Sequence, residues 1–320
     1  MRRYRTHDFC AGVAALAMLA CATVARAEES GSGHYFPGQT ASFIDAFPGK
    51  PGWSVLNIYL HYSADTRQSL PIAGLVTGRV SADIDADTPA VFYQGQGELP
   101  GGGAWTMGLT IPILTMRVKA DLTTPLGVRS KTDDETGLGD MEFFPLILGW
   151  KALGGDLKYD VRLAVYAPTG DFQQGTLANL GKNFWTFEPS LNLSWLSHTL
   201  GTEVGFFTGF DVNTDNTATN YESGTSWHLD TTVAQHLPLF GGFAGVGADT
   251  FLYYQITDDT GSGAKLGGFK GHTVGIGPVV SYVHEVKGAT VALEAKWLPE
   301  LDVAKRLEGD YWWVKLAVQF

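Results

Sequence analysis

The sequence contains few cysteines and few charged residues. Only two of its 320 residues are cysteine, Cys10 and Cys21, and only 17% are charged. Both cysteines lie in the first 27 residues, so disulfides cannot stabilise the rest of the chain. A disordered chain combines high net charge with few aromatic residues. The low charge and the aromatic content of 12% exclude that class.

Long apolar runs are also missing, except at the start of the chain. A basic start is followed by an apolar stretch from Phe9 to Val24 and by a small-residue cleavage site, Ala25-Arg26-Ala27. This order predicts a secretory signal peptide over residues 1–27, cleaved near Ala27. An uncleaved anchor and a lipoprotein modified at Cys21 are the alternatives. No later stretch has 18 apolar residues, so no transmembrane helix is expected.

Catalytic and metal-binding motifs are absent as well. The sequence has no Gly-x-Ser-x-Gly elbow, no Walker loop and no His-Glu-x-x-His. His228 and His236 share one face of an expected strand, but eight residues at about 3.3 Å each separate them by about 26 Å. They cannot share an ion, and we expect no metal, no cofactor and no catalytic residue.

The net charge excludes nucleic acid as a partner. Removing residues 1–27 takes away four Arg and one Asp, so the net charge of −11 becomes −14. Such an acidic chain repels the phosphate backbone.

Alternation with a period of two is abundant, by contrast. In residues 310–320, Trp312, Val314 and Leu316 occupy one parity and Lys315 the other, and alternate residues of a strand project to opposite faces. This pattern, together with the 40 glycines that suit tight turns, predicts about twelve strands. They span 52–64, 76–94, 102–121, 138–151, 156–167, 184–196, 202–212, 225–237, 242–256, 272–285, 290–300 and 310–320.

The apolar parity faces inward in a soluble sandwich or a lipocalin-like protein and outward in a membrane barrel. Three features favour lipid. Aromatic residues lie near strand ends on the apolar parity, the other parity is rich in Gly, Ser, Asn and Thr, and the last strand ends on Phe320. We predict an all-β protein, an antiparallel transmembrane β-barrel of about 12 strands over residues 52–320. It would lie in the bacterial outer membrane among lipid and lipopolysaccharide, and the even strand number would place both chain termini on the periplasmic side. The barrel-assembly machinery would bind the last strand.

Four blocks carry a resemblance to a known family. They begin at Leu138-Gly139-Asp140-Met141, Tyr166-Ala167-Pro168-Thr169-Gly170-Asp171-Phe172, Gly181-Lys182-Asn183-Phe184-Trp185-Thr186-Phe187-Glu188-Pro189 and Asp211-Val212-Asn213. Over roughly residues 34–320 the chain resembles the phenol meta-pathway degradation-like outer-membrane proteins, sometimes grouped as transporters. The resemblance implies passage of aromatic or other hydrophobic compounds across the outer membrane, without implying degradation of phenol.

The expected inner face of the barrel supplies the candidate ligand path. Its charged residues form either an ionic network that fills the lumen or a polar constriction, and its aromatic residues would contact a hydrophobic ligand. The candidates are Lys158, Asp160, Arg162, Glu188, Glu203, Asp211, His228, Asp230, Asp249, Phe251, Tyr253, Glu294, Lys296, Trp313 and Lys315.

Two further regions are ambiguous. The Gly/Pro-rich segment 28–51 is either a partial plug of the barrel or a periplasmic tail. Acidic groups at 133–135 and 258–259 are expected in loops, where they either bind a divalent cation or are simply solvated.

The leading hypothesis is a passive channel for small hydrophobic, above all aromatic, ligands. An outer-membrane lipid hydrolase that uses Ser226 and His228 is one alternative, and a structural or adhesive barrel is another.

Overall fold

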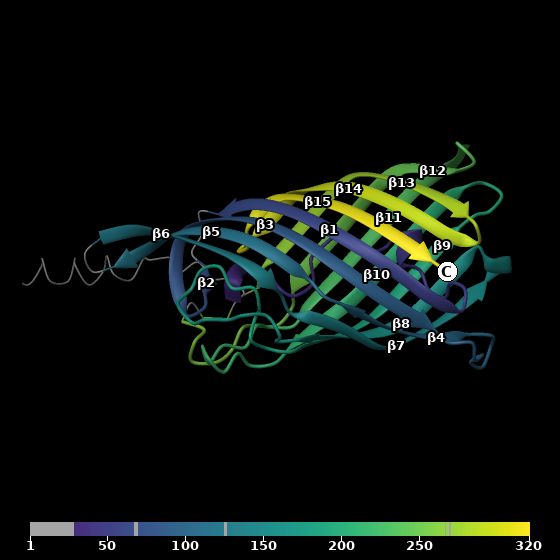
Figure 1. Cartoon of the computed structure of the whole chain (residues 1–320). Coiled ribbons are helices and arrows are strands. Elements are labelled where there is room, and N and C mark those ends of the chain that lie inside the picture. Colours follow the sequence, from purple (N-terminus) through teal and green to yellow (C-terminus); the bar gives the residue numbers. More distant parts are fainter. Residues whose placement is uncertain (1–28, 67–69, 125–126, 266, 269) are drawn as a thin grey trace, which may run out of the picture.

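The structure, a computed structural model, describes residues 29–66, 70–124, 127–265, 267–268 and 270–320. The predicted signal peptide, residues 1–27, lies outside them. The described chain forms one barrel of antiparallel strands (Figure 1). Its strands are β1 (Gly52–Thr66), β2 (Pro71–Ile72), β3 (Leu75–Gln94), β4 (Ala104–Thr110), β5 (Ile113–Thr124), β6 (Gly127–Leu138), β7 (Met141–Ala152), β8 (Leu157–Ala167), β9 (Thr186–Leu196), β10 (Thr202–Asn213), β11 (Ser226–Leu239), β12 (Gly242–Gln255), β13 (His272–Val286), β14 (Ala289–Ala304) and β15 (Glu308–Gln319). Three short 3-10 turns are η2 (Glu29–Gly31), η3 (Phe43–Asp45) and η4 (Leu153–Gly155).

The wall has twelve strand positions and is closed. Strands β7 to β15 pair with their neighbours in sequence order, and β1 pairs with both β15 and β3. Strands β4 and β5 occupy one position in succession, because both pair with β3. On their other side, β4 pairs with β7 and β5 pairs with β6. The predicted antiparallel barrel of about 12 strands is confirmed.

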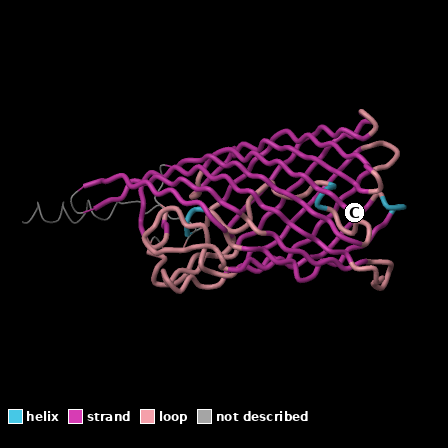
Figure 2. The backbone as a smooth tube through the Cα atoms, viewed as in Figure 1, coloured by secondary structure: helices cyan, strands magenta, loops and turns pink. Residues whose placement is uncertain are grey.

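The strand prediction was wrong in one region. Residues 102–121 were expected to form one strand and 122–137 a loop, but Pro112 separates β4 from β5, and β6 pairs with β5. This hairpin extends beyond the rest of the wall (Figure 2). Both faces of β6 are largely exposed, and across the hairpin Arg117 Nε donates to Asp134 Oδ1 at 2.5 Å. A strand with two polar faces has no apolar alternation, which explains why it was missed.

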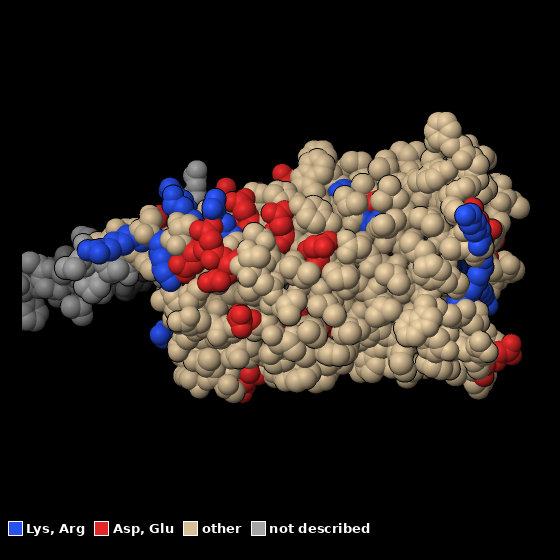
Figure 3. Space-filling model, in the orientation of Figure 1, with Lys and Arg blue, Asp and Glu red and all other residues tan. Residues whose placement is uncertain are grey.

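The apolar parity faces outward and the charged parity inward. On β15, Trp312, Val314 and Leu316 are 50%, 42% and 46% exposed, whereas Trp313 and Lys315 are 3% and 0% exposed. Figure 3 shows acidic residues gathered toward the long-loop end and a wide band of wall with almost no charged group. A water-soluble protein would not expose such a band, so the band fits the hydrocarbon region of a bilayer. No helix of the described chain has the length and apolarity needed to cross a membrane.

Residues 29–51, which we call the inner segment, run through the inside of the barrel (Figure 2). At the long-loop end, Lys182 Nζ donates to Ser32 O at 2.7 Å. At the short-turn end, Lys151 Nζ donates to Gly49 O at 2.9 Å. The first residue of β1 and the last of β15 lie at the short-turn end, which by loop length is the periplasmic side. Residue 29, the first described residue, lies at the opposite end, because the inner segment runs the length of the barrel before β1. The expected periplasmic position therefore holds for the C-terminus, while the N-terminal residues 1–28 lie outside the described chain.

Candidate functional site

Carboxylates of the barrel wall hold the inner segment along its length. Three strands supply them, β11 with Asp230, β10 with Glu203 and β8 with Asp160. Asp230 Oδ2 accepts from Gly38 N at 3.0 Å, Glu203 Oε1 accepts from Phe43 N at 2.7 Å, and Asp160 Oδ2 accepts from Phe47 N at 3.3 Å. A bond between a charged group and a backbone amide is stronger than a neutral hydrogen bond. The wall therefore fixes the inner segment at three levels.

Glycine in the wall makes room for the same segment. An added Cβ at Gly205 on β10 would lie 1.8 Å from the backbone oxygen of Ala41. Any side chain there would collide with the main chain of the inner segment. The sequence of β10 thus provides both the space for the segment and, in Glu203, one of its hydrogen-bond acceptors.

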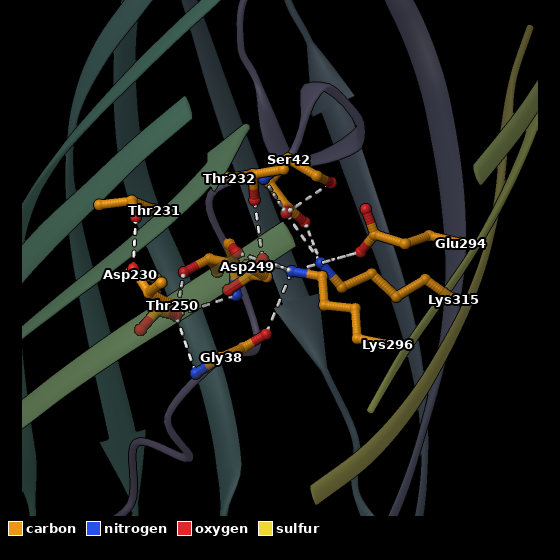
Figure 4. Close-up of polar contacts among 12 residues, drawn as sticks. Gly38, Ser42, Asp230, Thr231, Thr232, Asp249, Thr250, Glu294, Lys296 and Lys315 are labelled. Carbon is orange, nitrogen blue, oxygen red and sulfur yellow. Dashed lines mark hydrogen bonds and ion pairs between the residues drawn. The ribbon is translucent and has the colours of Figure 1, made fainter. Parts of the chain in front are cut away.

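A buried ionic network connects β12, β14 and β15 to the inner segment (Figure 4). Lys315 Nζ donates to both oxygens of Asp45, at 2.9 and 2.8 Å, and lies 3.4 Å from Glu294 Oε1. Lys296 Nζ donates to Asp249 Oδ2 at 2.7 Å and lies 3.5 Å from Glu294 Oε1. Each charge has an opposite partner, so the network satisfies the requirement for burying charges.

The remaining predicted lumen residues also point into the barrel. Arg162 Nε donates to Asp160 Oδ1 at 2.7 Å, with both side chains at most 5% exposed. Lys158 is half-buried. Five further predicted residues are buried on the inward faces of other strands: Glu188, Asp211, His228, Phe251 and Tyr253. Their burial accords with the predicted inward parity, while a role in a ligand path stays a prediction.

A cavity of about 110 Å³ lies on the other side of the lumen, between the wall and the inner segment. Apolar side chains of β1, β3 and β5 form much of its lining, and polar groups face it from the inner segment, from β7 and β8 and from the connections before β7 and after β8. The apolar lining includes Ile58, Leu60, Ile84, Ala86, Leu114 and Met116, and the polar lining includes His34, Asp140, Glu142, Tyr166 and Lys182.

The polar side of the cavity is ordered by hydrogen bonds. His34 bridges Asp140 and Thr186, with its Nε2 2.9 Å from Asp140 Oδ2 and its Nδ1 2.7 Å from Thr186 Oγ1. Its ring stacks on Tyr166 with centroids 5.0 Å apart. The indole N–H of Trp313, which also lines the cavity, has no hydrogen-bond acceptor among the described residues. The cavity therefore combines an apolar wall with a polar side whose groups are held in place by hydrogen bonds.

Only one of the predicted lumen residues, Trp313, lines this cavity. The predicted residues are charged and aromatic side chains of β8 to β15, whereas the cavity is lined chiefly by β1, β3 and β5. The sequence of β3 contained a pattern that could have indicated this cavity. There Ala82, Ile84 and Ala86 alternate with Asp83 and Asp85, and the apolar set faces inward, the reverse of the arrangement on β15.

The acidic groups expected in loops do not converge. Asp133 belongs to β6 and accepts from the backbone N–H of Leu177 at 2.7 Å. Asp259 is buried and accepts from the hydroxyl of Tyr221 at 2.5 Å. Both carboxylates therefore stabilise the long-loop end through hydrogen bonds.

Comparisons with known proteins place the chain in a family. A family model described as "Putative MetA-pathway of phenol degradation" matches residues 65–316. No curated protein matches the chain. Among solved structures, an outer membrane channel from Pseudomonas putida F1 is similar, with a TM-score of 0.63 and 14% identity. The match covers 89% of this chain and 100% of that one.

Two other barrels show weaker similarity. The β domain of the Bordetella autotransporter BrkA has a TM-score of 0.47 and 13% identity, covering 85% of this chain and 100% of that one. The low-pH structure of Pseudomonas putida OprB has a TM-score of 0.26 and 9% identity, covering 84% and 93%. The similarity to the channel from Pseudomonas putida F1, at 14% identity, supports the barrel fold alone.

Proposed function

The chain belongs to the family described by the phenol-degradation model, and we propose that it is a passive outer-membrane channel for small hydrophobic molecules, above all aromatic ones. The observation that carries this proposal is the cavity beside the inner segment. A dry apolar cavity of about 150 Å³ is sufficient to bind benzene, and the volume here is about 110 Å³. A single aromatic ring is thus the scale of ligand that suits it.

The lining also suggests which aromatic molecules would bind. Ile58, Leu60 and Ile84 offer apolar contact, and Trp313 adds an aromatic ring to the lining. Small-molecule sites commonly join an apolar wall to a few fixed polar groups. A ligand would enter at the long-loop end, cross this cavity, and leave to the periplasm or sideways into lipid.

The ionic network favours a narrow path through the barrel rather than an open pore. Lys315, Lys296 and Arg162 are fully paired and almost completely buried, together with the inner segment they hold. Water-filled porins have more strands, about 16 to 18, and correspondingly wider lumens. We infer a conduit selective for compact, weakly hydrated solutes.

Export and assembly belong to the same proposal. The protein would be exported with a signal peptide cleaved near Ala27 and inserted by the barrel-assembly machinery through its last strand. The outward apolar band would face outer-membrane lipid and lipopolysaccharide.

We also propose that the protein is not an enzyme. Ser226 and His228, the pair a hydrolase would use, are both completely buried.

Proteoliposomes test the proposal. Toluene and benzyl alcohol should equilibrate faster into vesicles with the folded barrel than into empty vesicles, while sucrose should not. Equal rates for the aromatic compounds would refute a channel. Fast sucrose entry would instead indicate an open pore, and esterase activity lost in His228→Ala would support the hydrolase.

A further inference from the structure

Three potential metal ligands meet on the inward face of adjacent strands, and none of them belongs to the cavity lining. They are Glu188 of β9, Asp211 of β10 and His228 of β11, each at most 2% exposed. One ligand atom from each lies within 4.8 Å of the others. His228 Nε2 is 3.4 Å from Glu188 Oε1 and 3.8 Å from Asp211 Oδ1.

The backbone is shaped to allow this approach. Gly209 of β10 pairs with Ser190 on one side and with His228 on the other. An added Cβ at Gly209 would lie 2.9 Å from His228 Nε2 and 2.8 Å from Ser190 Cβ. Because that position has no side chain, the imidazole of β11 can lie across β10 and face a carboxylate of β9.

The imidazole is held by stacking rather than by hydrogen bonds. Its ring stacks on Tyr35 of the inner segment at a centroid distance of 3.8 Å, and Phe207 lies 5.4 Å away on β10. Neither ring nitrogen of His228 has a hydrogen-bond partner among the described residues. Leaving a buried polar group without a hydrogen-bond partner destabilises the fold. A ligand for Nε2 would remove that cost.

The charges of the cluster call for a cation. Glu188 Oε2 accepts from the Tyr166 hydroxyl at 2.8 Å, and its other oxygen faces His228. His228 is the one ion-pair partner of Glu188 in the described chain. Two buried carboxylates that converge on one imidazole form an arrangement that favours a bound cation.

We propose that Glu188, Asp211 and His228 bind one divalent transition-metal ion of the zinc class. One imidazole nitrogen and two carboxylate oxygens form a ligand set that suits Zn²⁺, which is bound by three or four protein groups. Ca²⁺ and Mg²⁺ prefer six or more oxygen ligands and are less suited. Small side-chain shifts would bring the three ligand atoms to bonding distance.

Such an ion would act on the channel through two tyrosines. Tyr35 stacks on the ligating imidazole and belongs to the inner segment. Tyr166 donates to Glu188 and lines the cavity. The ion would thus fix β9, β10 and β11 to one another and set the position of one cavity wall.

Metal binding to the purified full-length barrel tests the proposal. After EDTA treatment and buffer exchange, Zn²⁺ is titrated calorimetrically, and bound zinc is counted by mass spectrometry. We expect one ion per chain in wild type and at least a tenfold loss of affinity in His228→Gln and Asp211→Asn. His236→Gln is the matched control, because His236 lies on the same strand and face and instead pairs with Glu203 at 2.6 Å.

The shift in gel mobility on boiling shows whether each variant is folded. If His228→Gln does not fold, the visible absorption of Co²⁺ bound to wild type is measured instead. We expect intense absorption, because Co²⁺ in sites with few ligands absorbs visible light strongly. Zinc binding that is equal in wild type and His228→Gln would overturn the proposal and assign the ions to surface carboxylates. Wild type that binds no ion would also overturn the proposal, and a protonated His228 would then lie between the two carboxylates. A weak absorption spectrum typical of octahedral Co²⁺ would overturn it as well.

Discussion

The bond between Lys315 and Asp45 provides the sharpest test of how the inner segment is held. Lys315 is completely buried and donates to both carboxylate oxygens of Asp45, at 2.9 and 2.8 Å. The substitution Lys315→Ala leaves Asp45 without this cation. At 2.8 Å and an effective dielectric constant near 20, the Coulomb attraction is about 6 kcal/mol before desolvation. Breaking a buried pair by removing one partner costs about 3–5 kcal/mol.

We therefore expect Lys315→Ala to lower the free energy of unfolding by about 3–5 kcal/mol. Urea unfolding of the barrel in vesicles measures it, with the folded fraction read from gel mobility without boiling. The double variant Asp45→Asn/Lys315→Met removes both charges at similar volume and should recover most of the loss, because neutral replacement of a buried pair is often tolerated. A loss below about 1 kcal/mol in Lys315→Ala would refute the reasoning.

Three further predictions concern the wall and the segment. Val314→Lys places a charge at the middle of an outward face and should cost about 2–4 kcal/mol in lipid; a change within about 0.5 kcal/mol would indicate a water-exposed surface. Gly205→Ala collides with the Ala41 oxygen and should destabilise the barrel by about 1–3 kcal/mol, while raising sucrose entry if the inner segment is displaced. Burial raises the pKa of Glu29 above its usual value of 4.5, so its ionisation favours the unfolded chain. Stability should therefore fall as pH rises from about 4.5, and Glu29→Gln should weaken that fall; an unchanged pH profile would contradict it.

The sequence predicted the wall because lipid and lumen impose opposite polarities on alternate residues. Strand β15 illustrates this, with Trp312, Val314 and Leu316 outside and Lys315 inside. The prediction failed at β6, whose two faces are both polar, and at Pro112, where one expected strand is divided into β4 and β5. Alternation is informative only where the two faces meet different surroundings.

The interior could be predicted only in part, because it depends on contacts between distant parts of the chain. Spacing along one strand shows that His228 and His236 cannot share an ion, and on that basis we expected no metal. It cannot reveal that Glu188 and Asp211 come from two neighbouring strands to meet His228 across Gly209. The choice between plug and tail for the inner segment likewise required the pairing of Asp45 with Lys315.

Passage of an aromatic molecule by the cavity is the central claim, and one comparison of variants tests it most directly. Ala86 is buried and lines the cavity, whereas Ala248 of β12 is exposed on the outer face. Ala86→Trp fills the cavity, and Ala248→Trp adds the same bulk toward lipid. The rate of toluene equilibration in proteoliposomes should fall to that of empty vesicles in folded Ala86→Trp and stay at the wild-type value in Ala248→Trp. An undiminished rate in Ala86→Trp would contradict the proposed path.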